Sequence, residues 1–204
     1  MVIEHGVRVA VSIAATLRFM TSPAPQSTPD HGDRPLITAI RSGGQTGVDR
    51  GALDAARAVG VTTEGWCPAA GWAEDLPEAP GLLVDYPELR ETPSSEPAQR
   101  TEWNVRDSDV TLIIGSDVEP GGSEVSPGTT LTRGLASFHG RPVRAVGRGD
   151  IEDACGWLQC QGTGLTVNIA GPRESERPGA YEAAFRIVGE LLRRSAGNQS
   201  SASA

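Results

Sequence analysis

Lysine is absent from this chain of 204 residues, so all 18 of its basic residues are arginines. This absence excludes Schiff-base chemistry on lysine and the nucleotide-binding loop that ends in Gly-Lys-Ser or Gly-Lys-Thr. Acidic residues number 26, and the resulting net charge of −8 does not suit nucleic-acid binding through counterion release. Fixed positive charge for an anionic ligand must therefore come from arginine, a helix N-terminus or a metal.

Cysteine is scarce, and the three that occur, Cys67, Cys155 and Cys160, are too dispersed for a disulfide framework. No Cys or His pair elsewhere completes a tetrahedral site with Cys155 and Cys160, so we expect no structural zinc and no other metal ligands. No apolar run reaches the roughly 18 residues of a membrane span, and residues 7–20 lack the flanks of a signal peptide. The sequence predicts a cytoplasmic protein with no membrane or nucleic-acid partner.

Composition divides the chain into three parts. Residues 21–35 combine four prolines with Ser, Thr, Asp and Gly, and such a segment cannot bury enough apolar area to fold. The last ten residues form a second stretch rich in Ser, Ala and Gly. We therefore predict a weakly ordered N-terminal extension over 1–35, a single folded domain over 36–194 and a disordered tail over 195–204.

Strands and helices are expected to alternate along the folded domain. Apolar runs predict strands at 36–40, 61–66, 81–86, 110–114, 142–146 and 165–169. Apolar periodicity and capping residues predict helices over 48–59 and 129–138, and helices that begin near 94, 151 and 178. This alternation indicates an α/β fold with a mainly parallel sheet of about six strands between two layers of helices.

Two glycine-rich segments follow strands, at the sheet edge where ligands of such folds bind. The first, Ser-Gly-Gly-Gln-Thr-Gly-Val-Asp-Arg at 42–50, joins glycines to polar side chains at a helix start, which favours an anion. The second runs from Gly121 to Thr132 and has the same character. The alternative interpretations are a plain strand-to-helix turn capped by Thr46 and a surface loop without a ligand.

Three further features follow predicted strands or share a helix face. Arg100 and Asn104 lie four residues apart, a spacing that also occurs on a solvated helix face with ion pairs. Asn168 and Arg173 flank a Gly-Pro turn. This turn could bind a ligand, and the alternative interpretation is a plain turn with a surface arginine. Cys67 ends a strand, where a buried, inert thiol is the alternative to a soft metal or dithiolene contact. The three histidines have no triad partners, so Ser-His-Asp hydrolysis has no support.

Several of these motifs, taken in chain order, resemble the molybdenum cofactor carrier family. The resemblance rests on residues 42–50, Gly-Trp-Cys-Pro at 65–68, Ala-Glu-Asp at 73–75, Tyr-Pro-Glu-Leu-Arg-Glu-Thr at 86–92, residues 100–109 and Asn-Ile-Ala-Gly-Pro-Arg at 168–173. It implies a Rossmann-like three-layer sandwich, related to the lysine-decarboxylase-like phosphoribohydrolases, that forms homo-oligomers. It also implies a carrier rather than an enzyme, which binds molybdopterin-type cofactor, or molybdate or tungstate as its fragment, for molybdoenzyme recipients.

Together the clusters and the resemblance define the predicted cofactor-binding residues. These are Gly43, Gly44, Gln45, Thr46, Gly47, Asp49, Arg50, Cys67, Arg100, Thr101, Asn104, Ser116, Gly128, Thr129, Thr130, Asn168 and Arg173. No catalytic residue is predicted.

The chain departs from the family pattern in two places. Residues 69–72 replace a short basic loop, and 123–127 resemble an insertion in the second glycine-rich segment. The alternatives to a carrier are a nucleotide-monophosphate phosphoribohydrolase and a nucleotide-sensing module of the same superfamily. The hydrolases are similar to one another in a Gly-Gly-x-Gly-Thr-x-x-Glu motif, whose Glu position Thr132 takes here, and a hydroxyl cannot replace a carboxylate at an oxocarbenium-like centre.

Overall fold

The computed structural model describes residues 34–115 and 127–197. The strands are β1 Ile37–Arg41, β2 Thr62–Glu64, β3 Trp66–Cys67, β4 Arg90–Glu91, β5 Val110–Ile114, β6 Val143–Val146 and β7 Leu165–Ala170. The α-helices are α1 Val48–Ala58, α2 Pro97–Arg106, α3 Pro127–Phe138, α4 Ile151–Gln159 and α5 Ala180–Gly197, and two 3₁₀ turns are η1 Ala69–Gly71 and η2 Gly81–Val84. Most of the predicted terminal extensions, Ser116 and residues 121–126 lie outside the described residues.

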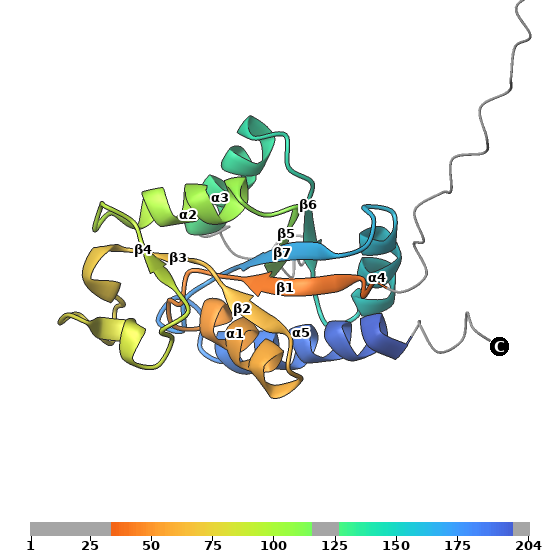
Figure 1. Ribbon diagram of the computed structural model, residues 1–204, viewed down its shortest axis with the longest axis horizontal. Coiled ribbons are helices and arrows are strands. Elements are labelled where there is room, and N and C mark those ends of the chain that lie inside the picture. Colours follow the sequence, from red (N-terminus) through yellow and green to blue (C-terminus); the bar gives the residue numbers. More distant parts are fainter. Residues whose placement is uncertain (1–33, 116–126, 198–204) are drawn as a thin grey trace, which may run out of the picture. The chain divides into compact units, whose positions relative to one another are not determined.

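Five strands form one parallel sheet in the order β2-β1-β7-β5-β6. Helices α1 and α5 pack against each other on one face of this sheet, and α2 and α3 pack together on the other (Figure 1). The prediction of an α/β, Rossmann-like three-layer sandwich with a parallel sheet is therefore confirmed. The strand order places β7 beside β1 and β5, so the segments that follow these three strands meet at one edge.

Burial explains why the central strands form. All five residues of β5 are buried, as expected for a parallel strand that is covered on both faces. Ile40, Leu112 and Ile169 from three neighbouring strands are at most 1% exposed and belong to one core, which the apolar faces of α1 and α5 complete. A second, smaller core lies under residues 67–89 and contains Leu53 and Leu82.

The predicted strand at 81–86 is wrong, because Gly81–Val84 form the 3₁₀ turn η2. Its apolar residues do not alternate: Leu82 is fully buried in the second core, whereas Val84 is 69% exposed. The predicted strand at 61–66 is divided into β2 and β3 at Gly65, whose φ of 153° suits glycine and where a Cβ would overlap the Ser42 carbonyl oxygen. β3 and β4 then form a separate two-stranded sheet, so the main sheet has five strands instead of about six.

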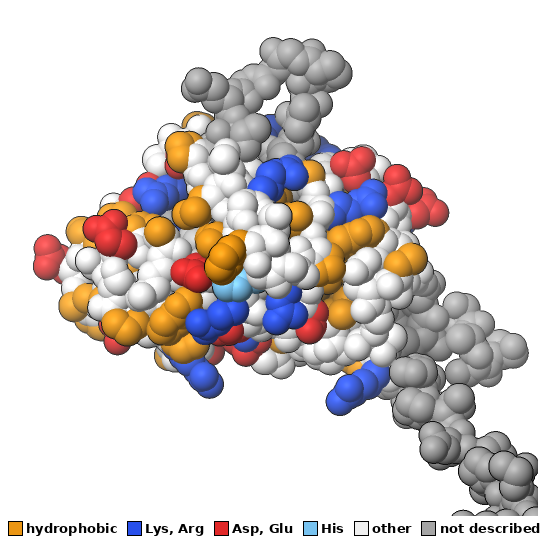
Figure 2. Space-filling model, turned by 90° about the horizontal axis from the view of Figure 1, so that it is seen from above, with side chains coloured by type: hydrophobic (Ala, Val, Ile, Leu, Met, Phe, Trp, Pro, Cys, Tyr) orange, Lys and Arg blue, Asp and Glu red, His pale blue; other side chains and the backbone are white. Residues whose placement is uncertain are grey.

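None of the helices in the described part of the chain is long and apolar enough to cross a membrane. On the face shown in Figure 2, acidic, basic and apolar side chains lie interspersed.

Candidate functional site

The loop after β1 and the turn after β7 lie in direct contact at the carboxyl edge of the sheet. The backbone N–H of Val48 donates to the Pro172 carbonyl at 3.2 Å. Gly47 has a φ of 77°, and a Cβ on it would come within 2.6 Å of the same carbonyl oxygen. Only glycine therefore fits this junction, which brings two of the predicted clusters together.

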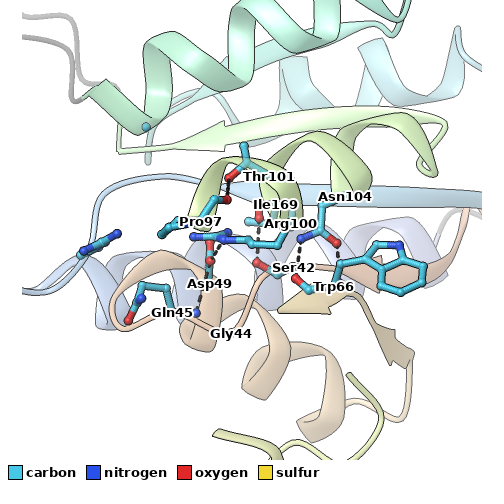
Figure 3. Close-up of polar contacts among 12 residues, drawn as sticks. Ser42, Gly44, Gln45, Asp49, Trp66, Pro97, Arg100, Thr101, Asn104 and Ile169 are labelled. Atoms are coloured by element: carbon cyan, nitrogen blue, oxygen red, sulfur yellow. Dashed lines mark hydrogen bonds and ion pairs between the residues drawn. The ribbon is translucent and has the colours of Figure 1, made fainter. Parts of the chain in front are cut away.

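A buried ion pair connects α1 with α2 beside this junction (Figure 3). Arg100 Nη1 donates to Asp49 Oδ2 at 2.9 Å, and the same carboxylate oxygen accepts from the Gln45 backbone N–H at 3.3 Å. The guanidinium lies so close to Gly43 that a Cβ there would overlap it. Arg100 Nε is buried and has no hydrogen-bond partner among the described residues.

The remaining polar side chains near this pair support the backbone. The Asn104 carboxamide accepts from the Trp66 N–H at 2.8 Å and donates to the Trp66 carbonyl at 2.9 Å, which fastens α2 to β3 (Figure 3). Thr101 donates its hydroxyl to the Pro97 carbonyl at 3.0 Å. Asn168, which is 3% exposed, donates to the Thr111 hydroxyl at 3.1 Å.

Five of these residues, Asp49, Arg100, Thr101, Asn104 and Asn168, line a cavity of about 40 Å³, which we call the polar pocket. It lies between α2, the first turn of α3 and the end of β7, and its lining residues are Asp49, Arg100, Thr101, Asn104, Gly128, Thr132, Asn168, Ile169, Ala170 and Gly171. Six of the predicted binding residues are in this lining, and they come from four separate segments. Of the other two on α3, Thr129 is buried and Thr130 is exposed.

Four other predicted residues lie in a second polar group around Glu74 and Asp75. The Gln45 side-chain oxygen accepts from the backbone N–H of Thr46 at 3.1 Å and of Glu74 at 2.9 Å, and the Thr46 hydroxyl donates to the Glu74 carboxylate. These bonds join the loop after β1 to residues 73–75. They account for the polar character of the glycine-rich loop without a ligand.

The two arginines of this group are held by its carboxylates. Arg50 forms a bidentate pair with Asp75 at 2.5 and 2.7 Å and donates Nε to the Gly44 carbonyl at 3.0 Å. Arg173 Nη1 lies 3.7 Å from Glu74 Oε2. Neither arginine lines the polar pocket.

Electrostatics keep both carboxylates ionised at neutral pH. Burial acts to raise the pKa of Glu74, but hydrogen bonds from Thr46 and Ser175 and the charge of Arg173 together lower it below its ordinary value. The hydrogen bonds from Arg50 lower the pKa of Asp75. Each arginine of the group therefore faces a charged partner.

Cys67 lies away from the polar pocket, in the second core, and is fully buried. Burial raises the pKa of its thiol to about 11, so the sulfur is a neutral core atom at neutral pH. Gly44 also faces this core, because a Cβ on it would meet Leu89 and Leu82. Among the described residues, no group of three or more His, Cys, Asp or Glu side chains could hold a metal ion.

Sequence reasoning missed a second cavity, of about 410 Å³, which we call the apolar cavity. It is lined by residues of α5 and of the segments that follow β5, β6 and β7, with Arg148 and Arg177 as its charged residues. Neither arginine belongs to a glycine-rich motif. The available signal was position alone: Arg148 follows a predicted strand by two residues, at the edge where ligands bind.

Comparisons with known proteins agree with this architecture. A family model described as the circularly permutated YpsA SLOG family matches residues 40–192. A crystal structure from Syntrophus aciditrophicus, named "putative molybdenum carrier protein", is 35% identical, with a TM-score of 0.66; the match covers 78% of this chain and 98% of that one. No curated protein matches the chain. These matches confirm the predicted resemblance, and the chain belongs to the circularly permutated YpsA SLOG family.

Proposed function

We propose that the protein binds and carries the molybdenum cofactor for delivery to molybdoenzymes, and that an anionic end of the cofactor enters the polar pocket. The observation that carries this proposal is the convergence of six predicted binding residues from four segments on one pocket. The name of the 35%-identical relative supports molybdenum as the cargo. The position at the carboxyl ends of parallel strands supports ligand binding in general.

The size of the polar pocket limits what it holds. A volume of about 40 Å³ accommodates a small oxyanion, such as a phosphate group or molybdate, but not a pterin ring. The remainder of the cofactor would then lie outside this pocket. The apolar cavity is a separate feature of the same edge.

Hydrogen-bond donors are available in the polar pocket for an oxyanion. Asn168 donates one of its two side-chain N–H groups to Thr111, and Asn104 donates one of its two to Trp66. Each therefore keeps a second N–H for a ligand. Arg100 adds its guanidinium, and the first turn of α3 adds the partial positive charge of a helix start. Asp49 balances the charge of Arg100, so recognition would depend on hydrogen bonds more than on net charge.

The acidic residues that line the polar pocket favour a carrier over a phosphoribohydrolase. Within the described lining of the polar pocket, the acidic residue is Asp49, which is already bonded to Arg100. Thr132, at the position of the hydrolase Glu, is buried and donates its hydroxyl to the Gly128 carbonyl at 2.8 Å. Thr132 has no carboxylate, and the Asp49 carboxylate is held by Arg100, so neither residue supplies a free carboxylate for ribose chemistry.

The proposal is tested by anaerobic titration calorimetry with molybdate, tungstate and purified molybdenum cofactor. The test variant is D49N/R100Q, because removal of both charges leaves neither one buried without its partner. We expect saturable binding by the wild type and at least about tenfold weaker binding by the double variant, the effect of losing a hydrogen bond from a charged donor. R106Q, on the same helix but paired with Asp107 on an exposed face, is the matched control.

Two results would contradict the proposal. One is the absence of saturable binding of all three ligands by the folded wild type. The other is release of free base from nucleotide monophosphates, which would assign the protein to the phosphoribohydrolases instead.

A further inference from the structure

The apolar cavity lies over the carboxyl ends of three adjacent strands. Pro172 follows β7, Gly115 follows β5 and Arg148 follows β6, and all three residues line it. Pro178 and Gly179, which precede α5, and Ala180, its first residue, also line the cavity. Its volume of about 410 Å³ falls in the range of small-molecule sites, roughly 300–1,000 Å³.

The walls of the apolar cavity combine apolar surface with cationic groups. Val48, Ile114, Ala183 and Ile187 contribute aliphatic side chains from α1, β5 and α5. Such walls favour an apolar or aromatic body over a free inorganic ion.

Two arginines, Arg148 and Arg177, are the charged residues of this lining, and no acidic residue is among the described residues that form it. Arg177 donates Nη1 to the Gly115 carbonyl, which fixes its guanidinium at the cavity. Arg148 is exposed and forms no ion pair with any described residue. Guanidinium groups match the several oxygen acceptors of a phosphate dianion, and Arg148 offers one that no described carboxylate holds.

The start of α5 is not the recognition element, because the protein already occupies it. Glu174 accepts from the backbone N–H groups of Gly179 at 2.5 Å and Tyr181 at 2.9 Å. Any anion in the cavity would therefore depend on the two arginines.

We propose that the apolar cavity is a second ligand site, which takes a small organic phosphate monoester. The apolar body contacts the aliphatic wall, and the phosphate contacts Arg148 and Arg177. The site shares no lining residue with the polar pocket, and it lies on the α5 side of the sheet rather than the α2 and α3 side. It goes beyond the proposed carrier function and stands on different residues.

The test is titration calorimetry of the full chain with 1-naphthyl phosphate at about pH 8, where a phosphate monoester is a dianion. We expect saturable binding that R148Q weakens at least about tenfold, because a charged hydrogen bond is lost. A183L should weaken binding, because its larger side chain occupies part of the cavity. R186Q, on α5 with its arginine paired to Glu182 and 59% exposed, is the matched control and should bind like the wild type.

The neutral analogue 1-naphthol and inorganic phosphate separate the two parts of the site, and both should bind much more weakly than the ester. The proposal is overturned if the wild type does not bind the ester, if R148Q binds it equally well, or if either fragment binds as tightly. It is also overturned if D49N/R100Q loses the ester, because the two sites would then not be separate. Thermal unfolding confirms that each variant is folded, and the exposed position of Arg148 makes R148Q informative even if A183L is unstable.

Discussion

The polar pocket and the apolar cavity lie on opposite faces of one sheet edge, but their arginines are in different states. Arg100 has a side chain only 13% exposed and is paired with Asp49, so the polar pocket has no net charge from its side chains. Arg148 is exposed, beyond hydrogen-bonding reach of any described carboxylate. The two pockets therefore offer a ligand different groups: hydrogen-bond donors beside a neutralised ion pair in the polar pocket, and the exposed guanidinium of Arg148 in the apolar cavity.

This difference follows from the composition of the chain. Acidic residues outnumber arginines 26 to 18, so most arginines near a loop find a carboxylate, as Arg50 finds Asp75 and Arg57 finds Glu88. Sequence proximity to a glycine-rich motif therefore does not identify an arginine that is available to a ligand. An arginine that is available to a ligand is better identified by the absence of carboxylates close to its guanidinium in the folded structure.

The largest expected effect comes from the junction between the two pockets. G47A would place a Cβ within 2.6 Å of backbone atoms of the turn after β7, at a φ that favours glycine. We expect the free energy of unfolding to fall by about 3 kcal/mol, and both pockets to be distorted. Urea denaturation measures the change.

G60A is the control for backbone conformation, because Gly60 has a similar φ of 74° with nothing within 4 Å of its Cβ position. Its cost should be about 1 kcal/mol. Equal losses in the two variants would show that the close contact at Gly47 does not matter.

The charge balance of the polar pocket gives the next effect. D49N keeps an oxygen for the Gln45 N–H but weakens the charged hydrogen bond to Arg100, so the free energy of unfolding should fall by about 2 kcal/mol. The same change gives the pocket a net positive charge, and molybdate should bind more tightly. Binding of 1-naphthyl phosphate should not change, since Asp49 does not line the apolar cavity.

A calorimetric comparison of the two ligands in D49N decides whether the distinction holds. Weaker molybdate binding would mean that Asp49 positions the ligand rather than neutralising Arg100. A change in naphthyl phosphate affinity would mean that the two pockets are coupled.

The fold was largely predictable because apolar runs mark the buried strands and glycines mark the ends of elements. Residues 110–114 are apolar throughout and form a buried central strand, and Gly60 follows the end of α1 as expected. The prediction at 81–86 was wrong because three consecutive apolar residues do not distinguish a strand from a 3₁₀ turn. Only the packing of Leu82 into the second core shows which one forms.

The candidate site was predictable to a smaller extent. Helical spacing correctly placed Arg100 and Asn104 on one face toward the sheet edge, where both line the polar pocket. Glycine freedom was interpreted as room for a ligand, whereas Gly43 makes room for the Arg100 guanidinium. Arg148 could not be singled out, because no local motif marks it. Its availability to a ligand depends on the absence of carboxylates near it in the described part of the folded structure, which the sequence does not show.

The smallest expected effect concerns the pair of Arg50 and Asp75, which lies outside both pockets. The Arg50 hydrogen bonds hold the folded-state pKa of Asp75 below its ordinary value of 3.8, so the pair stabilises the protein above that pH and loses its contribution as the pH falls through the folded-state pKa. Because Asp75 is 45% exposed, D75N should cost at most about 1 kcal/mol at neutral pH. The difference from the wild type should vanish in acid, as urea denaturation across a pH series would show.

Molybdate affinity in D75N then decides the role of Arg50. If Arg50 only fastens the loop after β1, loss of its partner changes stability and leaves the polar pocket as it was, since its Nε still donates to the Gly44 carbonyl. An affinity that rises in D75N would instead mean that the carboxylate had been withholding Arg50 from the anion. Arg50 would then belong to the binding site, as its sequence motif predicts, and the described charge balance of the polar pocket would be incomplete without it.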